Sequence, residues 1–100
     1  MNLDDLDYFK KLDAQNMLGE IDGLPDQLQA AWDLSKTQPL PELGDVRSIV
    51  ICGLGGSAIG ADLVSAYVAS SISLPVTVHR DYGLPAFAKG RQTLVICSSH

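Results

Sequence analysis

Basic residues, cysteine, histidine and long apolar runs are all scarce in this sequence of 100 residues. Seven Lys and Arg residues stand against twelve Asp and Glu residues, and the resulting net charge of −5 argues against binding to nucleic acid or to a membrane surface. No apolar run reaches the roughly 18 residues that a membrane-spanning helix needs. The acidic first residues have the wrong charge for a signal or transit peptide, so we expect a cytoplasmic protein.

The two cysteines, Cys52 and Cys97, each lie inside an apolar run that is typical of a strand. Free cysteine behaves as a small apolar side chain and is among the residue types that are most often buried. We therefore expect buried, reduced thiols rather than a disulfide or a pair of metal ligands. Nothing else in the sequence completes a metal site.

Charge is divided unevenly along the chain. Residues 1–45 contain ten acids and three bases, whereas residues 46–100 contain two acids and four bases. The second part also contains a glycine-rich stretch. Its mildly positive balance favours an anionic ligand there.

Residues 1–45 are predicted to form an N-terminal helical segment. Apolar residues recur at intervals of three and four over residues 3–12 and 14–21, and again from Leu24 onward. Pro25 stands in the first turn of the third helix, where proline is favoured, and two further prolines end helical structure before the first strand.

The chain is organised around a strand, a glycine-rich turn and a helix. Residues 46–52 are largely apolar without strict alternation, as in a strand of a parallel sheet that is covered on both faces. The turn that follows, Gly53-Leu54-Gly55-Gly56-Ser57, can adopt positive φ and let another group come close. Ser57 is expected to be the N-cap of a helix that runs to Ala69. The N–H groups of a first helical turn form a site for an anion such as phosphate.

The face of this helix that packs on the sheet is expected to be formed by four apolar residues. These are Ile59, Leu63, Ala66 and Tyr67. Asp62 and Ser65 are expected to point away.

Two further strands are predicted over residues 75–79 and 93–97. The order of strand, helix, strand and strand is that of an α/β fold with a doubly wound parallel sheet, of which three strands make the first half. Ligands of such sheets bind outside the carboxyl ends of the strands. Residues 53–57, 79–81 and 98–100 lie at those ends.

Three known glycine motifs can be compared with the turn. Gly55 and Gly60 have the spacing of a phosphate-binding P-loop, but Ala61 and Asp62 follow Gly60 where that motif needs lysine and a hydroxyl residue, so a P-loop is excluded. A nucleophile elbow is excluded because Ile59 stands where glycine is needed. The dinucleotide fingerprint is met by Gly53, Gly55 and Ala58, and Asp81 lies roughly where the ribose-binding acid is found, although it falls beyond the end of its strand.

Three separated motifs resemble one known family in order and spacing. They are residues 51–63, 80–85 and 94–100. They are similar to the start of the bifunctional phosphoglucose/phosphomannose isomerases, which carry sugar isomerase (SIS) domains with a flavodoxin-like topology. The resemblance covers about residues 13–100 and implies that residues 46–100 are the first, incomplete part of a SIS domain.

The resemblance also implies a site for the phosphate of a sugar 6-phosphate. In the family, the Gly-Gly-Ser turn and a serine-rich loop after the third strand hold this group. The matching residues here are Gly56, Ser57 and Ser99, with Gly53 and Gly55 supporting the turn.

The implied activity is the interconversion of glucose 6-phosphate or mannose 6-phosphate with fructose 6-phosphate through an enediol, with no metal and no cofactor. The family's catalytic residues lie in sequence that would follow His100, so none can be assigned here. The 100 residues alone are therefore expected to be inactive. A homodimer is expected for the full-length protein.

Other interpretations stay open from the sequence. SIS modules also serve as non-catalytic sugar-phosphate sensors, and the glycine pattern leaves a dinucleotide-binding oxidoreductase domain as a further alternative. The glycines would also suit a plain strand-to-helix turn, and the serines would suit capping or loop roles. His79 is expected to be structural, and Arg80 is expected to pair with Asp81 or another nearby acid.

Overall fold

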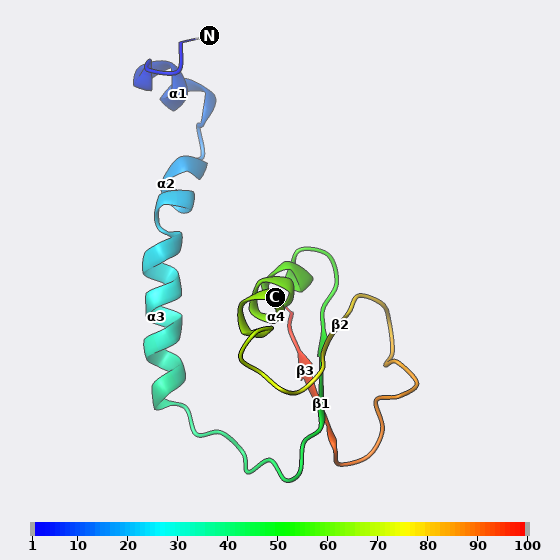
Figure 1. Ribbon diagram of the computed structural model, residues 1–100. Coiled ribbons are helices and arrows are strands. Elements are labelled where there is room, and N and C mark those ends of the chain that lie inside the picture. The colour runs from blue at the N-terminus through cyan, green and yellow to red at the C-terminus, as the bar shows by residue number, and fades with distance from the viewer. Residues whose placement is uncertain (1, 100) are drawn as a thin grey trace. The chain divides into compact units, whose positions relative to one another are not determined.

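The computed structural model describes residues 2–99. The chain divides between Pro41 and Glu42 into a helical unit and a sheet unit, each compact in itself. The first unit contains three helices, and the second contains a sheet and one helix. Figure 1 shows these elements along the chain. None of the helices over residues 2–99 has the length and apolar character needed to cross a membrane.

The helical unit contains α1 (Leu6–Leu12), α2 (Met17–Asp22) and α3 (Leu24–Thr37). The three predicted helices are confirmed in number and order, but the first two begin three residues later than predicted. At α1 the reason is a cap: the carboxylate of Asp5 accepts a hydrogen bond of 3.0 Å from the N–H of Tyr8. Pro25 lies in the first turn of α3, as predicted.

The start of α2 is determined by Asp13. Its two carboxylate oxygens accept hydrogen bonds from the N–H of Met17 at 2.7 Å and from the N–H of Leu18 at 2.8 Å. Asn16 precedes the helix with a left-handed backbone, φ 54°. The segment before Met17 is therefore a turn, and not helix from residue 14 as predicted.

The sheet unit has the predicted α/β order of β1 (Ser48–Cys52), α4 (Ser57–Val68), β2 (Val76–His79) and β3 (Thr93–Cys97). Both strand pairings are parallel, and the strand order is β2-β1-β3. The prediction of a parallel sheet is confirmed. β1 lies in the centre, so its continuous apolar run has a strand on either side, and its carboxyl end meets those of β2 and β3.

The most buried side chains come from β1 and α4. Val50 is fully buried and Ile51 nearly so, and in α4 the buried residues are Ala58 and Ala61. On α4, Ser65 is half-buried and follows Ala58 by seven residues, which continues the same helical face. Small side chains thus form the contact between α4 and the sheet.

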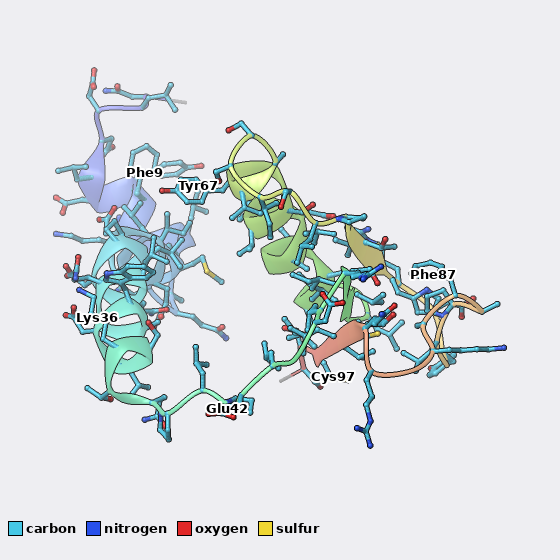
Figure 2. The ribbon with its side chains drawn as sticks, turned by 60° about the horizontal axis from the view of Figure 1, so that its bottom comes forward. Phe9, Lys36, Glu42, Tyr67, Phe87 and Cys97 are labelled. Atoms are coloured by element: carbon cyan, nitrogen blue, oxygen red, sulfur yellow. The ribbon has the colours of Figure 1, made fainter. Side chains whose placement is uncertain are left out.

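The predicted inner face of α4 was therefore wrong. Ile59, Leu63 and Tyr67 are exposed by 59%, 68% and 86%, and Ala66 is exposed as well. Tyr67 points away from the sheet in Figure 2. Alanine has no side chain beyond Cβ, so a face of alanine and serine lets the helix backbone lie close to the strands.

Candidate functional site

The carboxyl ends of the three strands are joined by backbone hydrogen bonds. The N–H of Gly53 donates to the carbonyl of His79 at 3.1 Å, and the N–H of Ser98 donates to the carbonyl of Cys52 at 2.8 Å. The glycine turn, the end of β2 and the segment after β3 thus lie at one edge of the sheet. This is the edge at which open α/β sheets bind their ligands.

The glycine turn needs glycine at two positions for different reasons. Gly55 has a φ of +56°, which residues with a side chain rarely adopt. A Cβ on Gly53 would lie 3.2 Å from the backbone N of Ala58 and 3.2 Å from the backbone C and O of Ser57. Gly53 therefore lets the start of α4 pack directly on the end of β1.

Ser57 does not cap α4, contrary to the prediction. Gly56 is the N-cap, its backbone is already helical with φ −60° and ψ −27°, and no side chain caps the helix. Ser57 is the first helical residue. A residue caps a helix with its side chain from the cap position, where its own backbone is extended. Here the cap position is taken by Gly56, whose backbone is helical, and Ser57 already lies inside the helix.

The turn satisfies the first N–H groups of α4 with its own carbonyls. The N–H of Ser57 donates to Leu54 at 3.2 Å, that of Ala58 to Gly55 at 3.1 Å, and that of Ile59 to Gly56 at 3.2 Å. These three donors are consequently engaged, and a ligand would have to use donors that lie earlier in the turn.

The N–H groups that lie earlier in the turn are not engaged in this way. Within residues 2–99, the N–H groups of Gly55 and Gly56 make no hydrogen bond, and neither does the half-buried hydroxyl of Ser57. A Cβ on Gly56 would meet no atom within 4 Å, so the space beside it is open. Two N–H groups and one hydroxyl are thus available to an anion at this turn.

Ser99 lies two residues beyond the end of β3 and is exposed. It follows Ser98, whose N–H bonds to the end of β1. The structure thus places both segments predicted to hold phosphate, residues 53–57 and 98–99, at the same edge of the sheet.

Arg80 pairs with a nearby acid, as predicted, and the acid is Asp62 of α4. Asp81 instead accepts a hydrogen bond of 2.7 Å from the N–H of Tyr82. The Arg80–Asp62 pair links the end of β2 to α4. Arg80 directly follows β2 and is the basic residue nearest in sequence to the carboxyl end of a strand, so the pair neutralises the positive charge at that edge. The sequence gives no signal for this pair, because its members are 18 residues apart and belong to different elements.

Cys52 and Cys97 are both free, as predicted, but their exposure differs. Cys52 is half-buried, whereas Cys97 is exposed, so the prediction that both are buried was wrong for Cys97. Cys97 is the last residue of β3, and β3 has a strand on one side only within the described sheet. Burial, and then the neighbouring Cys97 thiol, raise the pKa of the Cys52 thiol.

His79 is half-buried at the end of β2, and its Nε2 is buried with no hydrogen-bond partner in the described part of the chain. Across the sheet it is the register partner of Cys52. No group of three or more His, Cys, Asp or Glu side chains in residues 2–99 could hold a metal ion.

A comparison with known proteins finds a relative that matches most of this chain. Over 85 residues the chain is 41% identical to a bifunctional phosphoglucose/phosphomannose isomerase of Caldicellulosiruptor bescii. The matched region covers 84% of this chain and 25% of that protein, so the chain spans about a quarter of its relative's length. No family model matches the chain. No solved structure matches it either. The resemblance expected from the three motifs is thus confirmed.

Proposed function

We propose that this relative of a bifunctional phosphoglucose/phosphomannose isomerase supplies the phosphate-binding part of an aldose–ketose isomerase. The substrates would be glucose 6-phosphate or mannose 6-phosphate and fructose 6-phosphate. The observation that carries the proposal is the 41% identity to a protein of that name, over a region that includes the glycine turn. The position of residues 53–57 and 98–99 at one sheet edge supports it.

The donors at the turn suit a phosphate. A phosphate monoester carries close to two negative charges near pH 7, and hydrogen bonds to an ionised acceptor are roughly twice as strong as neutral ones. The N–H groups of Gly55 and Gly56 and the hydroxyl of Ser57 are uncharged donors on a turn that is fixed by its own hydrogen bonds. Consecutive N–H groups of this kind form concave anion sites that need no lysine.

Phosphate binding would serve catalysis at a distance. Aldose–ketose isomerisation opens the sugar ring and moves a proton between C1 and C2 through an enediol, while the phosphate at C6 does not react. Binding energy from such a remote group orients the reacting carbons. In this proposal the phosphate site lies in this chain, and no residue of the chain is assigned an acid–base role. The 100 residues alone should therefore give no turnover of glucose 6-phosphate.

Calorimetric titration of the folded chain with fructose 6-phosphate tests the proposal. Ser57→Ala and Ser99→Ala should each remove one hydrogen bond to a charged oxygen, a loss of about 1.5–3 kcal/mol. This corresponds to about a ten- to hundredfold rise in Kd. Because Ser57 caps nothing, Ser57→Ala should not lower the melting temperature. The matched control is Ser70→Ala, which should leave the Kd unchanged. Ser70 is an exposed serine just beyond the other end of α4.

The ligand controls identify the class of site. Fructose without phosphate should not bind, and inorganic phosphate should compete with fructose 6-phosphate. Unchanged affinity in both serine variants would remove the site assignment. Saturable binding of NADP without binding of fructose 6-phosphate would contradict the proposal and favour the dinucleotide interpretation of the glycine turn.

A further inference from the structure

The carboxyl ends of β1 and β3 bring two thiols together. Cys52 and Cys97 are register partners in the parallel pair of β1 and β3. Register partners of neighbouring parallel strands point to the same face of the sheet, and the strands lie about 4.7–4.9 Å apart. Disulfide-bonded cysteines usually have their Cα atoms about 4.4–6.8 Å apart, so this register is compatible with a bond.

We propose that Cys52 and Cys97 form a redox modification site, in which a peroxide-class oxidant converts the two thiols into an intramolecular disulfide across the sheet. The proposal does not depend on the function proposed above. A metal is the other natural ligand of two thiols, but within residues 2–99 no third His, Cys, Asp or Glu side chain completes a cluster with them.

The different exposure of the two thiols determines the order of the steps. Cys97 is exposed and reaches solvent oxidants, whereas Cys52 is half-buried. Burial and the adjacent Cys97 thiol also raise the pKa of Cys52, which keeps Cys52 protonated and slows its own attack on an oxidant. Cys97 is thus the thiol that reacts first, and Cys52 is the one that resolves the intermediate.

Both steps balance with hydrogen peroxide as the oxidant. The Cys97 thiolate attacks one peroxide oxygen, the O–O bond breaks, and Cys97 sulfenic acid and water form once the released hydroxide takes up the thiol proton. The sulfur of Cys52 then attacks the sulfur of Cys97, and the S–O bond breaks. The leaving hydroxide takes the Cys52 proton to give a second water. Two thiols are oxidised by two electrons in total, and one peroxide is reduced.

The bond would join two segments that already meet. Cys52 directly precedes Gly53, and Cys97 directly precedes Ser98, whose N–H donates to the Cys52 carbonyl at 2.8 Å. Closing the disulfide therefore needs little backbone movement. Figure 2 labels Cys97 on β3.

The test treats the reduced, folded chain with hydrogen peroxide, blocks remaining thiols with N-ethylmaleimide and measures the intact mass. We expect a monomer that has lost both thiols and is two hydrogen atoms lighter. Trypsin should then release residues 48–80 and 92–100 as one linked peptide that dithiothreitol separates, since Arg47, Arg80 and Arg91 are cleavage points. The fraction of chains with this link should be severalfold higher for the folded chain than for chain unfolded in urea.

Two serine variants separate the steps. In Cys52→Ser, the sulfenic acid at Cys97 should persist and be trapped by dimedone. In Cys97→Ser, oxidation of Cys52 should be at least tenfold slower than thiol loss in the unaltered chain. The proposal is overturned if the unaltered chain adds oxygen at Cys97 while Cys52 is still alkylated, if it links only to a second chain, or if the link forms equally in urea.

Discussion

The helical unit and the sheet unit differ in the sequence distance that their interactions span. In the helical unit, the carboxylates of Asp5 and Asp13 bond to N–H groups three to five residues away, and no residue of α1, α2 or α3 is buried. In the sheet unit, the hydroxyls of Ser48 and Thr93 share a hydrogen bond of 3.1 Å across 45 residues of sequence. Order in the first unit is therefore local, and order in the second depends on distant segments meeting.

This difference predicts which substitutions should change stability locally and which should destabilise a whole unit. An apolar residue in the helical unit can be changed with a local effect, because it lies at the surface: Leu28 is 73% exposed and Trp32 is 60% exposed. A residue at the centre of the sheet supports all three strands, so its loss should affect the whole unit. Two pairs of variants test this contrast, and a third pair tests which face of α4 is buried within the sheet unit.

The largest effect is expected from Val50→Asp in the centre of β1. Val50 is fully buried, and an isolated buried carboxylate costs many kcal/mol unless it is protonated or the structure opens. Since a small domain is stable by only about 5–15 kcal/mol, the sheet unit should unfold. Circular dichroism melts and amide hydrogen exchange should show the loss of protected amides in β1 and β3.

Leu28→Asp on α3 is the matched control, with the same new charge on an exposed position of the helical unit. Surface substitutions of this kind usually change stability by about 0.5 kcal/mol or less. Amide protection in β1 should stay as it is. Equal damage from both variants would show that the two units do not differ in this way.

A smaller effect is expected from Ala61→Leu, which tests the corrected face of α4. Ala61 is buried at the contact with the sheet, and extra methylene groups in a packed contact cost about 1–3 kcal/mol. Leu63→Ala removes a larger side chain, but one that is 68% exposed, and should cost about 0.5 kcal/mol or less. Urea titrations of both variants measure this. A larger loss of stability in Leu63→Ala than in Ala61→Leu would support the buried face that was predicted from the sequence.

The smallest effect is expected from Asp13→Ala, which acts within the helical unit. Removing the carboxylate that binds the first N–H groups of α2 should cost about 1 kcal/mol of local helix stability. Cα chemical shifts of residues 17–22 should move toward coil values, while those of β1 stay unchanged. Asp22→Ala, at the last residue of the same helix, should not weaken the helix, because an acid there opposes the helix dipole. Shifts that spread into β1 would contradict the local character of this unit.

Much of the fold could be predicted because its signals are local. The apolar runs located all three strands, and β3 was predicted with its observed ends, Thr93 and Cys97. The absence of alternation in β1 correctly indicated a strand of a parallel sheet. Its central position was not predicted. At the site, the glycine-rich turn correctly predicted positive φ, which occurs at Gly55. The role of Ser57 and Ser99 toward a ligand stays a prediction.

The sequence by itself determined the order of helices and strands, the parallel α/β class and the place of the glycine turn, because periodicity and backbone preference act between near neighbours in the chain. Tertiary structure alone decided which face of α4 is buried. Amphipathic spacing favoured Ile59 and Leu63, but close approach to the sheet selected Ala58 and Ala61. It also decided that the turn's own carbonyls, and not the Ser57 hydroxyl, satisfy the start of α4, and that Arg80 pairs with Asp62 and Cys52 lies beside Cys97. The bonds of the turn join residues three apart, whereas the buried face of α4, the Arg80–Asp62 pair and the Cys52–Cys97 pair join atoms that lie far apart in the sequence. Packing the strands and the helix together is what brings those distant atoms within reach.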